Sequence, residues 1–554
     1  MTWNARKTEP AAQEALLDEE KRLWETYNAL TFCDPKELPT GYKPTYFNPA
    51  VSWKRDNYRV RGTAGGDRMD YEGPTTARTA SMKTVKCLLN ATVSEPGKIF
   101  VSVDIKDFFL GTPLLTPEYM WLKRDQMTAT SRTKYGFDKF AKGDRALVRI
   151  DCAIYGLPQA ALLAQLRLDK HLATHGFHAD EHTACLYRHE SRDITFTLVV
   201  DDFGIKAKSD MVDIEYLLSC LREKYTITVD YTGTTYLGLT LQWDYSPPAG
   251  TRRSVTISMD GYVAKALLRF DIDTPTRKVH SPGGWERPQY GAQSQLTNPP
   301  DTSPRLPPAE VTRMQQIIGV VMYYAVALDL TLLPRIGQLA SLQSEATEFV
   351  RDGVLHLLQH MASYPSVSIT YFASDMRLFW SSDAAYLSEP KGGSRLGGIA
   401  MLGDNPPAEA TGRKRGGTTT PSDSFYNGVV CAVSVRCDVQ VSSAAEAEFG
   451  ALFYNGKQAV DFRNILQSLG YPQPPTWMET DNTTAWKLAN GTVKHRQSKA
   501  MDMRFFWITD RVKQGQFYVY WRKGEPRLIA PTSSPSVTRP SITARRVCDS
   551  SKTL

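Results

Sequence analysis

The chain has 554 residues, more than one hydrophobic core normally supports, so we expect about two to four domains. Its 42% hydrophobic and 23% charged residues exclude a chain that is disordered throughout. With 66 Lys and Arg against 59 Asp and Glu, the formal charge of +7 favours a polyanionic partner without requiring one.

Three features disfavour a secreted or membrane-spanning protein. The eight cysteines include no Cys-x-x-Cys pair and fit neither a zinc ribbon nor a disulfide framework. The first residues, MTWNARKTEPAAQEALLDEEKRL, are charged and lack the apolar core of a signal peptide. The most apolar run, Ile317 to Leu328, stops at Asp329 and is shorter than the roughly 20 residues that cross a bilayer. We expect a buried helix there, in an intracellular protein with no membrane partner.

The expected elements of the first 372 residues fall into three parts. Residues 1–45 have a charged helical pattern followed by the turn-rich run DPKELPTGYKP, and we interpret them as a leader. In residues 46–275, β-rich segments such as KIFVSVDI and ITFTLVV alternate with helical ones such as QAALLAQLRLDKHLATHG, which predicts an α+β domain. Residues 276–372 begin as a Pro- and Gly-rich linker and continue with helical patterns from Glu310 to Ala340 and from Glu345 to Ser363.

The remaining residues predict a second domain and a tail. Residues 373–525 begin with the β-rich run MRLFWSSDAAY and continue through a long helical pattern to the strand-like PTWMETDNT, so we expect an α/β domain. Residues 526–554 are basic and rich in Ser, Thr and Pro, which is typical of disorder.

Acidic residues in the first domain have the pattern of a nucleotidyl-transfer site. The segment VSVDIKDFFL places Asp104 at the end of an apolar strand, and TLVVDDFGIK places Asp201 and Asp202 at a turn between two β-rich runs. A strand end and a hairpin tip can meet, and nucleotidyl transfer requires converging carboxylates that hold two divalent ions about 4 Å apart. Adjacent Asp residues at a turn are more often solvated turn formers, so the surrounding motifs decide between the two interpretations.

The motifs around these acids resemble, in the same order, the polymerase of copia-type LTR retrotransposons. They are RVRGTAGGDRMDYEGP, VDIKDFFLGTPLLTPEYMWL, DCAIYGLPQAALLAQLRLDKHLATHGF, LVVDDFGIK, YLGLTLQ and IIGVVMYYAVAL. The resemblance implies an RNA-directed DNA polymerase, part of a Pol polyprotein. Its fold would be α+β, with the fingers and palm of a right-hand polymerase in residues 46–275 and a helical thumb or connection in 276–372. An RNase H-like α/β domain would follow in 373–525.

The resemblance also implies roles for single residues. Asp104 and Asp201 would be the principal metal ligands, with Asp202 as the second member of the paired turn. Phe109 would exclude a ribose 2′-hydroxyl and so select deoxynucleotides, although an ordinary core phenylalanine explains it as well. Val199 stands where the family commonly has a Tyr, which puts the usual contact to the primer end in doubt.

The resemblance also implies four further residues at the site of the incoming nucleotide. Gln159 would lie against it, and Pro158 would shape the turn that carries Gln159. Arg59 or Arg61 could bind the triphosphate through a bidentate guanidinium.

A second acidic set has the order of an RNase H site. Asp383 follows the strand-like RLFW, Glu448 lies on a helical segment, and Asp481 ends the strand-like WMETD. The resemblance selects Glu448 over Glu446, which we expect to be a solvated neighbour. The family's fourth acid is missing after VYWRKGE, so we expect the RNase H activity to be weaker than the polymerase activity.

A row of histidines is a separate pattern. Its members are His171, His175, His178 and His182, with Cys185 just beyond. Their helical spacing is compatible with a metal site. However, Gly176 should end the helix and turn the later two away, so we do not expect a metal there.

The most direct interpretation is a reverse transcriptase with a fused RNase H domain. It would use Mg²⁺, or Mn²⁺, with two ions per active site, and it would bind an RNA template, a DNA primer, an RNA–DNA hybrid and deoxynucleoside triphosphates. Integrase and Gag-like products of the same element are candidate partners, in a cytoplasmic particle or the nucleus. The alternative is a decayed or co-opted retroelement protein that only binds nucleic acid, and the chain could also be one segment of a larger polyprotein.

Overall fold

A computed structural model describes most of the chain. It covers residues 3–54, 57–283, 301–389, 392–405, 426–492 and 501–523. The expected tail at 526–554 and the region after VYWRKG, where the fourth acid would stand, lie outside the described residues.

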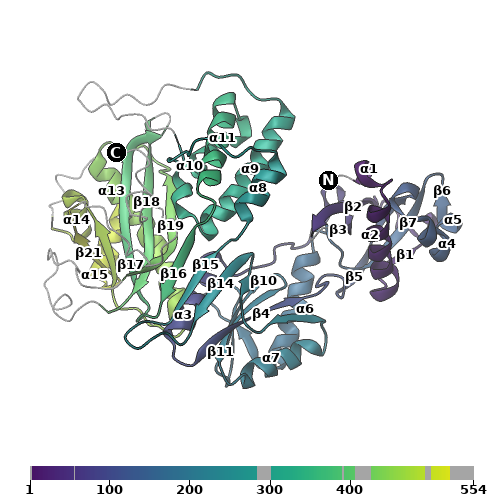
Figure 1. Ribbon diagram of the computed structural model, residues 1–554, viewed down its shortest axis with the longest axis horizontal. Coiled ribbons are helices and arrows are strands. Elements are labelled where there is room, and N and C mark those ends of the chain that lie inside the picture. Colours follow the sequence, from purple (N-terminus) through teal and green to yellow (C-terminus); the bar gives the residue numbers. More distant parts are fainter. Residues whose placement is uncertain are drawn as a thin grey trace.

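The N-terminal lobe is built on a mixed sheet with the strand order β1-β7-β5-β2-β3, and β6 pairs with β7 (Figure 1). Its strands are β1 (Leu30–Phe32), β2 (Thr45–Lys54), β3 (Asn57–Ala64), β5 (Pro113–Lys123), β6 (Ala141–Lys142) and β7 (Arg145–Cys152). Its helices are α1 (Trp3–Arg6), α2 (Pro10–Lys21), the π-helical turn η1 (Arg22–Thr26), α4 (Ala129–Tyr135) and α5 (Phe137–Phe140). Helix α2 packs on β3, and β1 pairs with β7, so the first 45 residues contribute to the packing of this lobe.

The central sheet has the order β12-β4-β11-β10-β9-β8. Its strands are β4 (Lys98–Ile105), β8 (Phe177–Ala179), β9 (Leu186–His189), β10 (Ile194–Val199), β11 (Asp202–Lys208) and β12 (Ile227–Asp230). Helices α3 (Met82–Ser94), α6 (Ala160–Thr174) and α7 (Val212–Arg222) pack against it. Strands β4 and β10 confirm the β-rich prediction for KIFVSVDI and ITFTLVV, because apolar side chains on both faces of the sheet are buried.

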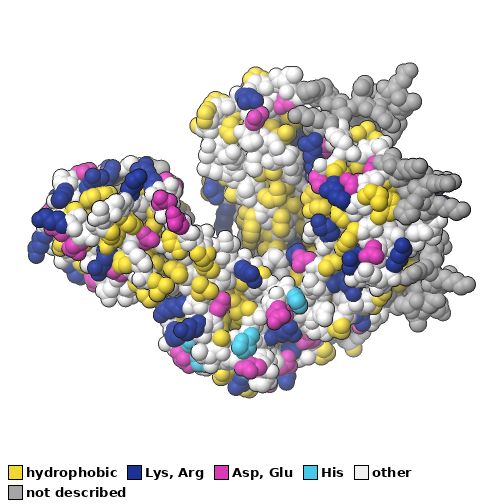
Figure 2. All heavy atoms as spheres, turned by 180° about the vertical axis from the view of Figure 1, so that it is seen from behind, with side chains coloured by type: hydrophobic (Ala, Val, Ile, Leu, Met, Phe, Trp, Pro, Cys, Tyr) yellow, Lys and Arg dark blue, Asp and Glu magenta, His cyan; other side chains and the backbone are white. Residues whose placement is uncertain are grey.

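A small sheet and a group of helices follow the central sheet. The sheet consists of β13 (Thr235–Tyr236), β14 (Leu239–Asp244), β15 (Ser254–Ser258) and β16 (Ser368–Phe372). The helices are α8 (Tyr262–Phe270), α9 (Pro308–Ala327), α10 (Leu333–Leu342) and α11 (Glu348–Ser363). Figure 2 shows that the molecule is hollowed between the N-terminal lobe and the part that carries these helices.

Two predictions for this helical region were wrong in detail. The single helix expected from Glu310 to Ala340 is interrupted after Ala327, where the buried Asp329 accepts a hydrogen bond from Thr331, and Pro334 lies in the first turn of α10. A proline in the first turn is compatible with a new helix but not with a continuing one. The expected buried helix, α9, also exposes one face, since Tyr323 and Val326 are each 41% exposed. Within the described residues, none of the helices combines the length and hydropathy needed to span a bilayer.

The C-terminal sheet has the order β19-β18-β17-β20-β21. Its strands are β17 (Arg377–Glu389), β18 (Gly393–Gly403), β19 (Tyr426–Arg436), β20 (Thr476–Thr480) and β21 (Phe517–Trp521). Strand β17 is antiparallel to β18 and parallel to β20. Helices α13 (Ala444–Ser468), α14 (Thr483–Ala489) and α15 (Trp507–Lys513) pack beside the sheet. Helix α13 can approach closely because Gly398 has no side chain: a Cβ there would lie 2.5 Å from the Asn455 amide.

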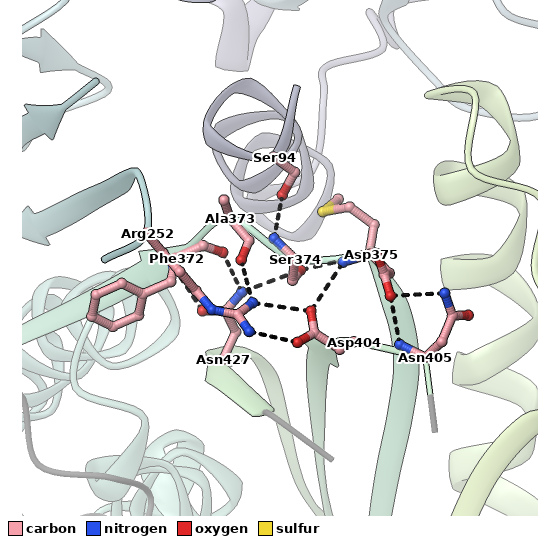
Figure 3. A network of polar contacts seen from close by, with 10 residues as sticks. Ser94, Arg252, Phe372, Ala373, Ser374, Asp375, Asp404, Asn405 and Asn427 are labelled. Atoms are coloured by element: carbon pink, nitrogen blue, oxygen red, sulfur yellow. Dashed lines mark hydrogen bonds and ion pairs between the residues drawn. The ribbon is translucent and has the colours of Figure 1, made fainter. Parts of the chain in front are cut away.

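A short junction joins the small sheet to the C-terminal sheet (Figure 3). Residues 373–376 connect β16 to β17, and each of their backbone N–H groups donates a hydrogen bond. The acceptors are the Arg253 carbonyl, Ser94 Oγ, Asp404 Oδ1 and Ser374 Oγ. Arg252 adds bonds to the Ala373 carbonyl at 2.8 Å and to Asp404 Oδ2 at 2.7 Å. The connection is therefore fixed to both of the bodies that it joins.

Candidate active sites

The turn between β10 and β11 carries the paired aspartates. Val199 and Asp202 pair across the hairpin, so Val200 and Asp201 form a two-residue turn. Val200 has φ of 60°, whereas Asp201 is not in the left-handed region. A β-branched residue rarely adopts positive φ, and such strain persists only where the surroundings hold it. The turn therefore holds Asp201 at the hairpin tip in one backbone conformation.

Asp104 meets this turn from the neighbouring strand. In the β4–β11 ladder Asp104 lies directly opposite Asp202, which places both side chains on the same face of the sheet. The N–H of Ile105 donates a hydrogen bond to the Asp201 carbonyl at 3.0 Å. The structure thus brings together the strand end and the hairpin tip that carry the three predicted acids.

The members of the aspartate pair have different neighbours. Burial raises the pKa of Asp201, and the nearby charge of Asp104 raises it further, while Arg61 opposes the shift. Burial raises the pKa of Tyr236 and of Tyr323, and the charge of Asp202 raises both further, so its carboxylate lies toward β13 and α9. Asp201 is therefore the member that lies near both Asp104 and the cationic residue of β3.

Arg61, Tyr155 and Phe109 form a stack beside Asp201. The Arg61 guanidinium lies 4.5 Å above the centre of the Tyr155 ring, and Phe109 meets the same ring edge-on at 5.1 Å. Arg61 Nε is buried without a hydrogen-bond partner. A buried donor without a partner is costly, so an anionic ligand that reached it through a small movement of the side chain would satisfy it. Sequence reasoning missed Tyr155, although it lies in the quoted motif that contains Gln159.

The other predicted nucleotide-binding residues have different surroundings. Gln159 is only 3% exposed, and its Nε2 donates to Glu118 Oε1 at 2.9 Å, while its own Oε1 is buried without a partner. Pro158 is half-buried in the preceding loop. Burial raises the pKa of Glu19, and Arg59 lies close enough to oppose that rise. The two arginines of β3 thus have different surroundings, and Arg61 is the one beside Asp201.

The second acidic set forms a compact cluster. Ligand oxygens of Asp383, Glu448 and Asp481 lie within 4.8 Å of one another. Strands β17 and β20 are parallel, and Ser381 is in register with Glu479, so the acids two residues beyond each come side by side. Helix α13 brings Glu448 to the same point. The three residues selected from the sequence therefore do meet.

Glu448 is the buried member of this cluster. Burial raises the pKa of Glu448 well above its usual range, and the charges of Asp383 and Asp481 raise it further. Its Oε2 is buried without a hydrogen-bond partner. An unpartnered carboxylate oxygen among other carboxylates is costly unless a proton or a cation is bound. The donor set consists of oxygens only, which fits a hard divalent cation such as Mg²⁺.

Glu446 does not have the solvated position that we expected. It is only 3% exposed, and its Oε2 accepts hydrogen bonds from the Ser442 N–H and hydroxyl, both at 2.7 Å. Its Oε1 accepts the Asp502 N–H at 3.0 Å. Glu446 therefore joins the start of α13 to the segment around Asp502. The sequence identified it as a neighbour of the site but could not reveal its long-range partners.

The histidine row separates as Gly176 suggested. Helix α6 ends at Thr174, Gly176 has φ of 80°, and His178 lies on strand β8. His171 and His175 do approach Glu223, with ligand atoms within 4.8 Å. Protein groups already engage these rings: His171 Nε2 lies 2.7 Å from the Cys220 carbonyl, and His175 Nε2 lies 3.2 Å from Glu223 Oε2.

Among the described residues, only the C-terminal triad and this histidine group bring three candidate ligand atoms so close. The acids Asp104, Asp201 and Asp202 converge more loosely.

No family model matches the chain. The chain is 21% identical over 489 residues to a retrovirus-related Pol polyprotein from transposon TNT 1-94 of Nicotiana tabacum, across 86% of this chain and 33% of that protein. Two solved structures match the chain, each with a TM-score of 0.47. One is a foamy viral protease-reverse transcriptase with double-stranded DNA, at 11% identity over 94% of this chain and 71% of that one. The other is a foamy viral protease-reverse transcriptase with an RNA/DNA hybrid, at 12% identity over 96% and 56%. Over most of its length, this chain is similar to a retrotransposon Pol polyprotein, of which it spans about a third.

Proposed function

We propose that the chain is the reverse transcriptase and RNase H portion of a copia-type Pol polyprotein. It would copy RNA into DNA and degrade the RNA strand of the resulting hybrid. The observation that carries this proposal is the presence of two carboxylate centres in one chain. One lies where β4 meets the β10–β11 turn, and the other lies where β17, β20 and α13 meet.

The first centre has groups suited to joining a primer to a deoxynucleoside triphosphate. Two Mg²⁺ ions, when bound, would polarise the primer 3′-hydroxyl and neutralise the triphosphate. Asp104 and Asp201 would supply their carboxylate ligands. Arg61, with its unpartnered Nε, would bind phosphate oxygens, and Phe109 on the Tyr155 ring would lie against the sugar. The hollow beside the N-terminal lobe would admit the nucleic acid (Figure 2).

The second centre has groups suited to hydrolysis of a phosphodiester. Asp383, Glu448 and Asp481 would hold Mg²⁺ beside the RNA strand. When bound, the ion would lower the pKa of a water molecule enough for attack on the phosphodiester at neutral pH. The buried Glu448 would become ionised as the cation binds, because the cation then supplies the partner that its Oε2 lacks.

The proposal can be tested with two variants, each of which is the control for the other. A labelled DNA primer on RNA and DNA templates reports synthesis, and labelled RNA in a preformed hybrid reports cleavage. Asp201→Asn should abolish extension and leave cleavage intact, whereas Glu448→Gln should abolish cleavage and leave extension intact. Primer–template binding, followed by fluorescence anisotropy, should be unchanged in both. Retained extension by Asp201→Asn would refute the assignment of the first centre.

The alternative is a protein that binds nucleic acid without synthesis. Val199, in place of the family's Tyr, motivates it. In that case the wild-type protein would bind primer–template with Mg²⁺ and all four deoxynucleotides present but would extend no primer on either template. That outcome would overturn the polymerase proposal and favour a co-opted binding protein.

A further inference from the structure

An arginine of the N-terminal helical segment binds an aspartate that lies between Asp104 and Phe109 in the chain. Arg22, in η1, and Asp107, after β4, are 85 residues apart in sequence. Arg22 Nε donates to Asp107 Oδ2 at 3.2 Å, and Nη2 contacts Oδ1, so the pairing is bidentate. The Tyr27 hydroxyl donates to the same Oδ2 at 3.2 Å. Three donors from one short segment therefore fix the Asp107 carboxylate.

Arg22 is itself anchored to the sheet of the N-terminal lobe. Its Nη1 lies 2.7 Å from Glu19 Oε2, and the side chain of Glu19 is only 1% exposed. Glu19 Oε1 accepts the N–H of Gly62, in β3, at 2.9 Å. This position has no room for a larger residue than Gly62, because a Cβ there would lie 2.7 Å from Leu23 Cδ1. A continuous polar connection thus runs from β3 through α2 to Asp107.

Asp107 occupies the turn that determines where Phe109 lies. It has φ of 54°, and it stands three residues after Asp104 and two before Phe109. The Leu110 N–H bonds to the Asp107 carbonyl at 2.9 Å, and the Thr112 N–H bonds to the Phe109 carbonyl at 2.8 Å. A non-glycine residue keeps positive φ only where other contacts hold it. Without Arg22, the turn would be free to relax and Phe109 would shift on the Tyr155 ring.

We propose that Arg22 is a positioning residue for deoxynucleotide selection. It holds the Asp107 turn, and through that turn it sets the place of the Phe109 ring relative to Asp104. This inference rests on the proposed polymerase function and deepens it, because it makes the N-terminal helical segment a structural part of the nucleotide site. The ligand affected is the sugar of the incoming nucleoside triphosphate.

Steady-state single-nucleotide insertion with matched deoxy- and ribonucleoside triphosphates tests this role. We expect Arg22→Ala to raise the KM for the deoxynucleotide and to lower the deoxy/ribo ratio of kcat/KM by between about tenfold and a hundredfold. Arg22→Lys, which keeps the charge but loses the planar fork, should restore part of the ratio. Cleavage of a preformed hybrid by the same variant should keep its wild-type rate, since the C-terminal centre is separate.

Lys134→Ala is the matched control. Lys134 pairs with Glu25, also in η1, at 2.5 Å, but both side chains face solvent, with exposures of 56% and 41%. Its removal should change neither KM nor the deoxy/ribo ratio. Exposed pairs of this kind contribute little to stability, so the control should fold as the wild type does.

Each outcome separates the inference from the proposed function. If the wild type extends primers and Arg22→Ala keeps the wild-type KM and ratio, the inference is wrong and the polymerase proposal stands. If the wild type extends no primer, the proposed function fails and the inference fails with it. If Arg22→Ala does not fold, Tyr27→Phe carries the test, because it removes only the third donor to Asp107. We expect a smaller loss of discrimination for Tyr27→Phe, and unchanged discrimination would overturn the inference.

Discussion

The backbone N–H of Ile105 and the backbone carbonyl of Asp201 are joined by a hydrogen bond of 3.0 Å. This bond ties the end of β4 to the tip of the β10–β11 hairpin. The main chain therefore sets the relative placement of the Asp104 and Asp201 backbones, and side-chain torsions only orient the two carboxylates. Such preorganisation matters for a metal centre, because misplaced ligands would have to be reordered at each binding event.

Val200→Gly should separate stability from activity at this hairpin. Glycine relieves the strain of a β-branched residue at positive φ, worth about 1–3 kcal/mol, but adds about 0.5–1 kcal/mol of unfolded-chain entropy. We expect the free energy of unfolding, measured with denaturant, not to fall by more than ~1 kcal/mol, while extension slows because the tip is less restrained. A loss of stability well beyond that would contradict the strain that we assign to Val200. Val199→Gly, in the adjacent strand, should lower the free energy of unfolding.

Glu448→Gln should raise the thermal stability of the metal-free protein. The substitution keeps the shape of the side chain and removes a carboxyl group that burial and two neighbouring carboxylates make costly to ionise. With Mg²⁺ the order should reverse, since only the wild type gains a full ligand set. Differential scanning fluorimetry with EDTA and with Mg²⁺ measures both effects. Glu446→Gln is the matched control on the same helix. It should lower the melting temperature in both conditions, because Glu446 accepts bonds from Ser442 and Asp502.

The same residue predicts a specific dependence of stability on pH. Because the pKa of Glu448 is raised in the folded state, the folded protein binds a proton more tightly than the unfolded chain does. The resulting stabilisation is complete below the ordinary glutamate pKa of 4.5 and is lost as the pH rises through the folded pKa. Without metal, the wild type should therefore lose stability relative to Glu448→Gln as the pH is raised from the ordinary glutamate pKa of 4.5 toward the higher pKa of the folded state. Equal slopes for the two proteins would contradict the assignment.

Tyr323→Phe should weaken use of the primer, because the YLGLT segment at the β13–β14 turn resembles the hairpin with which copia-type polymerases grip the primer strand. The Tyr323 hydroxyl donates to the Leu237 carbonyl at 2.6 Å, across from α9 to the β13–β14 turn. Leu237 has φ of 51°, which a non-glycine residue keeps only where other contacts hold it, whereas Gly238 adopts its φ of 73° freely. The bond from Tyr323 helps to hold Leu237. We expect a severalfold higher KM for primer–template and an unchanged KM for the deoxynucleotide. Tyr262→Phe, which loses a 2.9 Å bond to the Val320 carbonyl, is the control for loss of a hydroxyl in the same region.

The sequence was informative where local pattern determines position. Asp104 and Asp201 were predicted at a strand end and a hairpin tip because apolar runs and turn residues define both. The C-terminal triad was predicted from the strand-like runs that carry Asp383 and Asp481 and from the resemblance that selects Glu448, and the fold brings the three acids together. The register of the paired strands then determines which of these residues lie next to each other.

The residues that were missed depend on contacts between distant segments. Nothing in the residues around Arg22 indicates a partner 85 positions away, and Asp107 looks like an ordinary turn former. The burial of Glu446 was missed for the same reason, because its partner segment at Asp502 lies 56 residues further on. The broken helix is a different case: apolar periodicity continues through residues 328–332, although Asp329 and Pro334 interrupt the backbone pattern.

The fully hydrogen-bonded junction at residues 373–376 has a consequence for how the two centres could share a substrate. A loose tether would let the C-terminal sheet sample many positions along a bound duplex. A junction that is hydrogen-bonded to Ser94, Arg253 and Asp404 would instead keep the distance between the two centres constant. RNA fragments cut during synthesis would then have a narrow length distribution, set by the protein rather than by the sequence of the template.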